Sequence, residues 1–221
     1  GADVLKIAHP EGGDDSRGYQ SPKIGGEGAY FLAYNRNKRS VALDLGTEEG
    51  RAVAKALIAR ADVVVENFST GVMAKFGLDY ESVAKDNPRL VYCSISGYGH
   101  DGAFASRACY APVVQAESGF MSITGYPDRP PVRTGIPMID VATGLAAAQA
   151  VLAALYARER TGEGQYVEAA LYDIAVAMTY HFGMSYLVDG RNLTRMGNGS
   201  PAAEPIGVFQ ASDGPFQMTI A

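Results

Sequence analysis

An aspartate stands where a strand pattern gives way to an apolar helix pattern. Residues 165–171 have strand character, residues 174–178 are apolar, and Asp173 lies at the junction. In open α/β sheets, ligands bind beyond the carboxyl ends of the strands, and the N–H groups that begin the next helix stabilise an anion there. A carboxylate so placed can act as a nucleophile. Aspartate is also a favoured helix N-cap, so position alone leaves both interpretations of Asp173 open.

A second chemical feature is the basic cluster formed by Arg36, Lys38 and Arg39. The chain has a formal net charge of −5 and a pI near 5.2, so any surface for an anionic partner must be a local patch. Guanidinium and ammonium groups both bind phosphate. The cluster is therefore either a phosphate-binding site or an exposed basic loop, and we expect no nucleic-acid partner.

The elements that must position these residues follow an alternating pattern. Short β-branched runs alternate with helical patterns, which is typical of βαβ units around a mostly parallel sheet. We therefore predict an α/β fold, a Rossmann-like, mostly parallel sheet with flanking helices. Strands are predicted at residues 2–7, 40–45, 62–66, 89–95, 165–171 and 216–221. Helices are predicted from the N-cap Thr47 to about residue 61, over 79–86 and over 139–160, with loops at 97–108 and 190–205.

Composition sets the class of protein. Hydrophobic residues make up 47% of the chain and charged residues 19%, as in globular proteins that bury a core. Cys93 and Cys109 are too few for a disulfide framework and lack metal-ligand spacing, so we expect a reducing, cytoplasmic setting and no metal. We see no apolar run of the roughly 18 residues that a membrane span needs, and therefore expect no membrane segment.

Both ends of the chain have the pattern of strands cut from a longer sheet, so we expect this chain to be a piece of a longer protein. Within it, residues 1–205 are predicted to form a large domain, truncated at its N-terminus. Residues 206–221 are predicted to begin a linker or a second, smaller domain.

Several segments resemble family III coenzyme A (CoA) transferases of the CaiB/BaiF type, which include formyl-CoA transferase-like proteins. Residues 161–173, Thr-Gly-Glu-Gly-Gln followed by a strand and Leu-Tyr-Asp, resemble the nucleophile segment of that family. The other matching blocks keep the family order and span nearly the whole chain. They are Ala-Asp-Val-Leu-Lys-Ile (2–7), Asn-Arg-Asn-Lys-Arg-Ser-Val-Ala-Leu-Asp-Leu (35–45), Ala-Asp-Val-Val-Val-Glu-Asn-Phe (61–68), Asn-Pro-Arg (87–89), Ser-Ile-Ser-Gly-Tyr-Gly (94–99) and Asp-Gly (213–214).

The resemblance implies an enzyme of acyl-CoA metabolism that moves CoA from an acyl-CoA donor to a carboxylate acceptor, with Asp173 as the nucleophile that forms an aspartyl-CoA thioester. It also implies an interlocked homodimer when the protein is full length. CoA would be a substrate, and its binding residues would be Arg36, Lys38, Arg39, Leu43, Asp44, Leu45, Asn67, Phe68, Lys75, Arg107 and Tyr110.

Some positions depart from the family pattern. Ala8 and His9 stand where a Glu followed by a basic residue or Pro is common, and Gly46 replaces a frequent Lys. Ala111 replaces an acidic residue that usually follows the position of Tyr110. The last change removes a carboxylate that could lie near the nucleophile, so it could alter substrate preference or weaken activity.

Two other functions stay open at this point. The α-methylacyl-CoA racemases share the fold and move an α-proton with a His/Asp pair, whose His matches Tyr110 and whose Asp matches Asp140. Tyrosine, with an unperturbed pKa near 10, is a poor substitute for that His. Asp140 also fits a cap of the long helix, and His100 is expected to be solvated rather than catalytic. The third possibility is a CoA-binding remnant without turnover.

Overall fold

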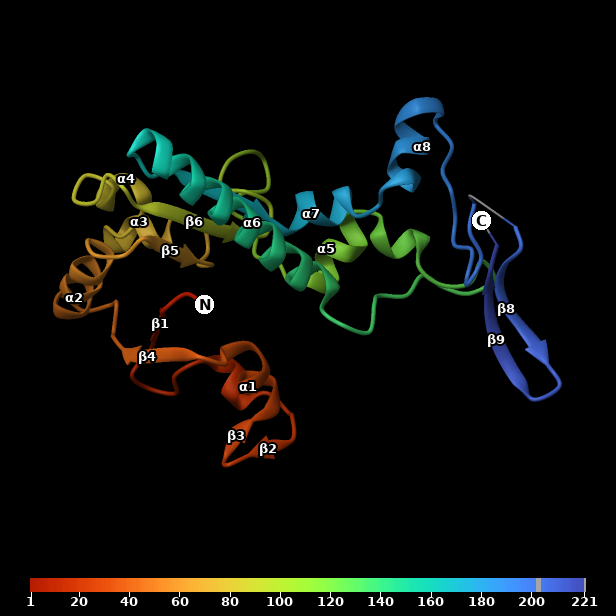
Figure 1. Cartoon of the computed structure of the whole chain (residues 1–221), viewed down its shortest axis with the longest axis horizontal. Helices are drawn as coiled ribbons and strands as arrows, with labels where there is room; N and C mark the ends of the chain where they lie inside the picture. Colours follow the sequence, from red (N-terminus) through yellow and green to blue (C-terminus); the bar gives the residue numbers. More distant parts are fainter. Residues whose placement is uncertain (202–203, 221) are drawn as a thin grey trace. The chain divides into compact units, whose positions relative to one another are not determined.

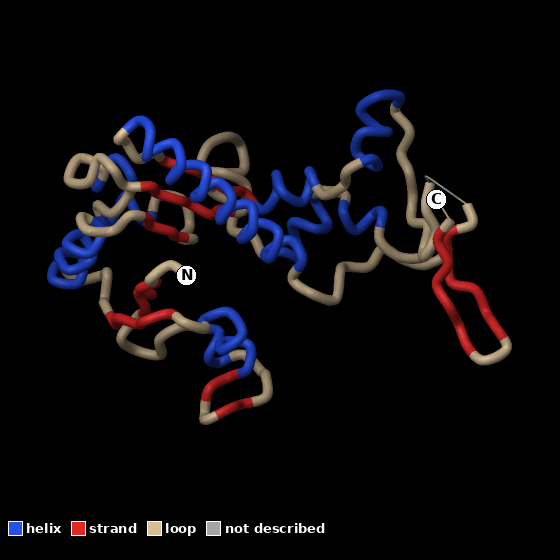
Figure 2. Tube along the Cα trace, viewed as in Figure 1, coloured by secondary structure: helices blue, strands red, loops and turns tan. Residues whose placement is uncertain are grey.

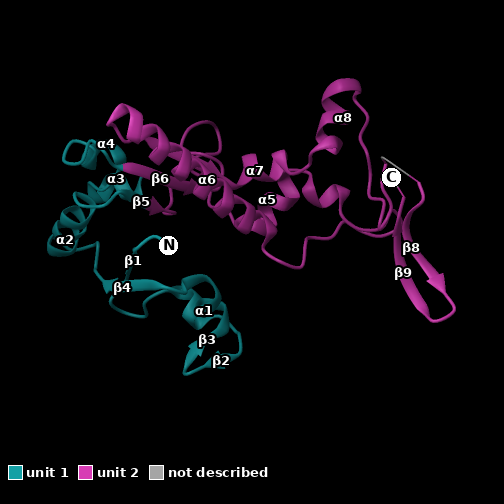
Figure 3. Ribbon diagram, viewed as in Figure 1, with its two compact units in different colours: residues 1–64, 71–90 teal, residues 65–70, 91–221 magenta. Residues whose placement is uncertain are grey.

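The computed structural model describes residues 1–201 and 204–220. These residues form two compact units, drawn in separate colours in Figure 3. The first unit contains residues 1–64 and 71–90, and the second contains residues 65–70 and 91–221. The boundary expected between residues 205 and 206 remains a prediction, and residues 202, 203 and 221 lie outside the described part of the chain.

The first unit is built on two parallel strands, β1 (Val4–Ala8) and β4 (Lys38–Ala42). Val4 lies opposite Lys38, and Ala8 lies opposite Ala42. Helix α2 (Glu48–Ile58) begins where the sequence predicts it, because Thr47 Oγ1 accepts a hydrogen bond from the backbone N–H of Gly50 at 3.0 Å. The strands of this unit are β1 (Val4–Ala8), β2 (Lys23–Ile24), β3 (Glu27–Gly28) and β4 (Lys38–Ala42). Its helices are η1 (Asp15–Gly18), α1 (Ala29–Asn35), α2 (Glu48–Ile58), α3 (Val72–Phe76) and α4 (Tyr80–Val83).

The second unit is organised by the central strand β6 (Val91–Ser96), which lies between β5 (Val63–Glu66) and β7 (Tyr166–Ala170). The last two residues of β5 belong to this unit. Strands β6 and β7 are parallel, with Tyr92 opposite Tyr166. Since β6 is buried on both faces, it has a near-continuous run of buried residues rather than an alternation.

Helices cover this sheet and carry its core. The long helix α6 (Met138–Thr161) packs on β6, β7 and α7 (Leu171–Ala177). Figure 1 shows α6 beside β6 and α7. Its residue Ile139 joins Ala111, Val114, Leu171 and Ala175 in a buried apolar cluster. The remaining elements, coloured by type in Figure 2, are α5 (Ala111–Glu117), η2 (Phe120–Ile123), α8 (His181–Asp189), β8 (Ile206–Ala211) and β9 (Gly214–Thr219).

The predicted α/β class, with parallel strands and flanking helices, is confirmed. The helix predicted over residues 79–86 is reduced to α4, since the chain turns toward Asn87, whose side chain donates to the carbonyls of Ile58 and Ala61. The terminal strand predicted over 216–221 is β9, which begins at Gly214, while Ala221 lies outside the described residues.

Helix α6 corrects one expectation from the sequence. By length and composition it is apolar enough to cross a membrane, so the expectation that no segment would reach that threshold is wrong. The scattered Thr143, Gly144 and Gln149 do not lower its mean hydropathy enough. Core helices of soluble proteins pass the same test, and α6 packs on strands and helices of its own unit.

Candidate active site

Asp173 is the third residue of α7, directly beyond the carboxyl end of β7. The N-cap of this helix is Ala170, so the interpretation of Asp173 as an N-cap is wrong. Its side chain is exposed, and within residues 1–201 and 204–220 it has no ion pair or side-chain hydrogen bond. The first turn of α7 thus presents an unengaged carboxylate, which is what a carboxylate nucleophile requires.

The loop after β6 is joined to the helix that carries Asp173. The N–H of Tyr172 donates to the carbonyl of Gly97 at 3.0 Å, and the ring of Tyr172 lies 5.7 Å from that of Tyr98. Arg107 stacks over Tyr98 at 5.0 Å and pairs with Glu117, which also accepts a 2.6 Å hydrogen bond from Tyr98 Oη. Burial and this hydrogen bond raise the pKa of Tyr98 to about 12. Arg107, a predicted CoA residue, is therefore held in the same cluster as the neighbour of Asp173.

Tyr110 and Ala111 begin α5 in different environments. Tyr110 is the N-cap residue and is 79% exposed, whereas Ala111 is buried against Leu171 and Ala175 of α7. A carboxylate at position 111 would enter an apolar cluster, so alanine here contributes packing behind α7. Asp140 lies in the first turn of α6, whose N-cap is Pro137, so Asp140 does not cap that helix.

A pocket in the first unit gathers part of the basic cluster. It has a volume of about 390 Å³ and is lined by Lys38 and Arg39 of β4, but not by Arg36, which is the exposed C-cap residue of α1. Lys6, His9 and Arg17 bring further positive or protonatable groups to the lining, beside one acid. The sequence did not point to Lys6 or Arg17, because they come from separate elements that only the fold brings beside β4.

The charges of this pocket are only partly balanced. Lys6 Nζ pairs with Asp14, while Arg39 forms a two-point ion pair with Asp3 at 2.7 and 3.0 Å. Burial and the nearby charge of Lys6 lower the pKa of Lys38, with Asp14 opposing the shift. The ammonium groups of Lys6 and Lys38 repel each other, so an anion bound between them would stabilise both.

Asp14 yields a pH prediction. Burial pushes its pKa upward, but the ion pair with Lys6 and the hydrogen bonds from Ser16 outweigh burial and lower the pKa from 3.8 to about 2. The resulting stability is complete above pH 3.8 and is lost as the pH falls toward 2. Asp14→Asn should therefore lower the free energy of unfolding by about 2 kcal/mol at neutral pH.

Urea unfolding of the natural full-length protein between pH 7 and 3, followed by circular dichroism, measures the difference in the free energy of unfolding between wild type and Asp14→Asn. This difference should shrink as the pH falls below about 4. Asp15→Asn is the control, because the neighbouring Asp15 is exposed and makes no ion pair with the described residues. A cost that stays constant across this pH range would contradict the assignment.

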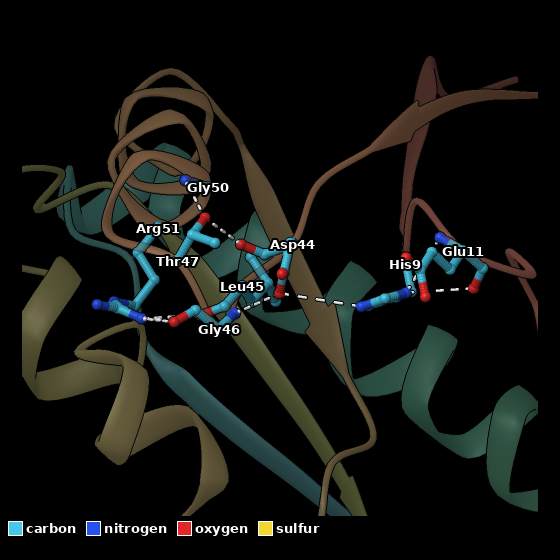
Figure 4. A network of polar contacts seen from close by, with 8 residues as sticks. All are labelled: His9, Glu11, Asp44, Leu45, Gly46, Thr47, Gly50 and Arg51. Carbon is cyan, nitrogen blue, oxygen red and sulfur yellow. Dashed lines mark hydrogen bonds and ion pairs between the residues drawn. The ribbon is translucent and has the colours of Figure 1, made fainter.

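The turn from β4 to α2 carries the predicted adenine-end residues Leu43, Asp44 and Leu45. Of these, Asp44 and Leu45 belong to the network shown in Figure 4. The carboxylate of Asp44 accepts from the N–H of Gly46 at 2.8 Å and lies 3.9 Å from His9 Nε2. Arg51 donates to the carbonyls of Leu45 and Gly46 at 3.1 and 2.8 Å. Arg51 thus fixes the turn, a role with no signal in the sequence because Arg51 lies within a helical pattern.

The other predicted CoA residues lie at strand and helix ends. Asn67 follows β5 and donates to the carbonyl of Ile95 at 2.6 Å, and Phe68 is half exposed, with its N–H bonded to Glu66 at 2.8 Å. Lys75 is exposed in the last turn of α3, in the first unit. The predicted set therefore divides between the two units. Lys38 and Arg39 share the pocket, whereas Asn67, Phe68, Arg107, Tyr110 and Asp173 belong to the second unit.

Comparison with known protein families shows which family this chain belongs to. The family model for CoA-transferase family III matches residues 1–221. The chain belongs to CoA-transferase family III. The resemblance carried by the ordered sequence blocks is thereby confirmed, and the Asp173 segment lies within the matched region.

Two relatives and one solved structure show how close the match is. The chain is 46% identical over 220 residues to succinate–glutarate CoA-transferase of Agrobacterium fabrum, covering 97% of this chain and 55% of that relative. It is 42% identical over 217 residues to acetyl-CoA:oxalate CoA-transferase of Acetobacter aceti, covering 98% and 56%. A crystal structure of a CaiB/BaiF family protein from Brucella suis superimposes with a TM-score of 0.90 at 45% identity, covering 97% of this chain and 58% of that one. This family III chain therefore spans about half the length of the relatives it matches.

Proposed function

We propose that this protein transfers CoA between carboxylic acids through an aspartyl-CoA thioester on Asp173. The observation that supports this most directly is the exposed carboxylate in the first turn of α7, at the carboxyl end of a parallel strand, in a chain of CoA-transferase family III. N–H groups at the start of a helix favour the ionised form of a carboxylate. The first turn of α7 is therefore a suitable place for a carboxylate nucleophile.

The proposed reaction conserves the energy of the thioester. Asp173 attacks the donor thioester carbonyl and expels the CoA thiolate, which leaves a mixed anhydride. The thiolate then attacks the aspartyl carbonyl, releasing the donor acid and forming the aspartyl-CoA thioester. The acceptor carboxylate attacks this thioester and expels the thiolate, which leaves a second mixed anhydride. The thiolate then attacks the acyl carbonyl of the acceptor, which forms the new acyl-CoA and frees the Asp173 carboxylate.

We further propose that the acids are small dicarboxylates. The names of the relatives support this class, since they include transferases named for succinate and glutarate, oxalate, and mesaconate. We also propose a cytoplasmic enzyme, in keeping with two cysteines that are free thiols, and an interlocked homodimer in the full-length protein, as the family resemblance implies.

Assays of CoA transfer and of α-hydrogen exchange distinguish a transferase from a racemase. The natural full-length protein should move CoA from succinyl-CoA to an added dicarboxylate, and it should not exchange the α-hydrogen of a 2-methylacyl-CoA with deuterated solvent. Tyr110 as an exposed N-cap residue offers no paired base for that exchange. Rapid α-deuteration without transfer would overturn the proposal and favour Asp140 over Asp173.

The basic pocket makes a second prediction. If Lys38 and Arg39 bind the phosphates of CoA, the double variant Lys38→Gln/Arg39→Gln should weaken CoA binding about 10- to 100-fold and flatten its salt dependence. Adding Arg36→Gln should change little more, because Arg36 does not line the pocket. Isothermal titration calorimetry at two salt concentrations measures both effects.

The matched control for this prediction is Lys23→Gln, an exposed lysine of β2 outside the pocket lining. It should leave CoA affinity within about twofold, as expected for a solvated surface charge. Equal losses in the control and in the pocket variant would show that only the overall charge of the protein matters.

A further inference from the structure

The loop of residues 97–109, between β6 and α5, is bonded at its base to the helix that carries Asp173. The two ends of this loop meet, because Gly97 passes so close to Cys109 that a Cβ at position 97 would lie 2.2 Å from Cys109 Sγ. The carbonyl of Gly97 accepts the backbone N–H of Tyr172 at 3.0 Å. That N–H belongs to the first turn of α7, where backbone donors have no partner within the helix. The loop therefore holds the residue that precedes Asp173.

Aromatic side chains extend this contact between the loop and α7. The ring centres of Tyr98 and Tyr172 lie 5.7 Å apart, and those of Tyr98 and Phe104 lie 5.9 Å apart. Both pairs are tilted, an arrangement that stabilises aromatic rings beyond the area they bury. Arg107 Cζ lies 5.0 Å from the ring centres of both Tyr98 and Phe104, within the range of a cation–π interaction. The guanidinium of Arg107 therefore packs on two rings of its own loop.

Glu117 of α5 holds both the tyrosine and the arginine of this group. One carboxylate oxygen, Oε2, accepts a hydrogen bond from Tyr98 Oη at 2.6 Å. The other, Oε1, accepts from Arg107 Nη2 in an ion pair. Since α5 also packs on α7, the Glu117 carboxylate connects a neighbour of α7 to the loop that bonds the first turn of α7.

A second attachment of the loop lies on the side of the strands. The ring nitrogens of His100 lie 2.6 Å from Ser94 Oγ and 3.2 Å from Thr70 Oγ1, so the expectation that His100 would be merely solvated is wrong. Thr70 also donates to the carbonyl of Ala105 at 2.7 Å. Because these contacts do not involve Glu117, loss of the Glu117 contacts should shift the loop without detaching it.

The contacts of Arg107 distinguish it from a residue that is free to bind phosphate. Its charge already faces the Glu117 carboxylate, and its guanidinium lies over two rings. A phosphate would have to displace that carboxylate and compete with both rings. By contrast, Lys38 in the pocket of the first unit bonds neutral oxygens of Tyr34 and Asn35 and forms no ion pair within residues 1–201 and 204–220. Lys38 can accept an anionic partner without losing one.

Resting on the proposed role of Asp173, we propose that Glu117, Arg107 and Tyr98 form a clamp that positions the first turn of α7. Arg107 is then a positioning residue and not a ligand of the CoA phosphates. By holding the loop against Tyr172, the clamp sets where the Asp173 carboxylate lies relative to the thioester of the bound substrate. Such placement matters because a shift of about 1 Å in a reacting group can lower a rate by up to about 100-fold.

The clamp predicts a separation of kcat from CoA affinity in the natural full-length protein. Glu117→Gln and Arg107→Gln should each lower kcat for CoA transfer about tenfold. The dissociation constant of CoA should stay within about twofold of wild type, and its salt dependence should be unchanged. The double variant should be no slower than the slower single variant, because both changes remove the same contact. Tyr98→Phe keeps the ring and loses only the hydrogen bond, so it should cost about threefold in kcat.

Arg160→Gln is the matched control. Arg160 also lies over a tyrosine, with Cζ 4.5 Å from the ring centre of Tyr156, but at the end of α6 opposite to Ile139, which packs on α7. This variant should leave kcat and CoA affinity within about twofold of wild type. If Arg107→Gln instead keeps the wild-type kcat while CoA affinity falls tenfold and loses salt dependence, Arg107 is a phosphate ligand and the proposal is overturned.

Amide hydrogen–deuterium exchange without ligand tests the clamp independently of activity. In Glu117→Gln, residues 97–107 and the N–H of Tyr172 should exchange faster than in wild type. The urea midpoint should stay close to that of wild type, since the ion pair is exposed. Identical exchange in the two proteins overturns the clamp, whatever the activity. Faster exchange in a protein that still transfers CoA after Asp173→Asn would support the clamp and contradict the proposed function instead.

Discussion

Asp173→Ala should abolish CoA transfer, with turnover lower by about 10⁴-fold or more, because the proposed reaction forms two successive covalent bonds at this carboxylate. CoA affinity should stay within a few-fold of wild type, since the residue forms a bond and does not anchor the ligand. Stability should change by at most about 1 kcal/mol, the range for an acid in a first helical turn. The side chain is exposed and is outside the buried cluster behind α7.

Steady-state transfer assays and CoA titrations of the same preparations separate these effects. Asp173→Asn is the sharper variant, because it keeps the shape and removes the nucleophilic oxygen. Asp128→Asn is the control, an exposed acid whose ion pair is with its neighbour Arg129. Full activity of Asp173→Asn would remove Asp173 from the mechanism.

Gly50→Ala should strongly destabilise the first unit. A Cβ at position 50 would lie 1.9 Å from the carbonyl oxygen of Asp44 and 2.7 Å from its carbonyl carbon. That backbone cannot move freely, because the same carbonyl accepts from Thr47 Oγ1 at 2.8 Å and from the N–H of Thr47 at 3.1 Å. We expect a loss of about 2–4 kcal/mol, at or above the usual cost of overpacking.

The same variant should weaken CoA binding, because displacing Asp44 moves the turn that carries Leu43 and Leu45, which the family resemblance assigns to the adenine end of CoA. Gly144→Ala is the matched control. This glycine also lies within a helix, but a Cβ there meets open space, so alanine should raise stability by up to about 1 kcal/mol. Urea unfolding curves measure the free energy of unfolding of Gly50→Ala, Gly144→Ala and the wild type. A Gly50→Ala protein as stable as wild type would show that the β4–α2 turn is not fixed.

The sequence predicted the parts of this fold that depend on local pattern. The runs that became β5 and β6 contain β-branched residues, and the run that became β7 follows a glycine-rich turn. Thr47 caps α2 because a hydroxyl before two glutamates is a strong helix start. Similarly, the place of Asp173 beyond β7 follows from a strand ending next to an apolar helix.

The remainder of the site depends on tertiary contacts that no local pattern predicts. Asp14 reaches Lys6 only because the chain after β1 folds back over the pocket, and no spacing rule predicts it. His100 and Ser94 are close in the sequence, but Ser94 also contacts Glu66, which lies on another strand. Arg36 was grouped with Lys38 and Arg39 by proximity in sequence, but β4 begins after it and only the latter two line the pocket.

The central claim is the covalent intermediate on Asp173, and trapping it is the most direct test. The natural full-length protein, incubated with succinyl-CoA and then treated with hydroxylamine, should carry a hydroxamate on Asp173, identified by peptide mass spectrometry. The modification should require the acyl-CoA and should be absent from Asp173→Asn. Transfer that proceeds while Asp173 stays unmodified, or with the label on another residue, would contradict the mechanism.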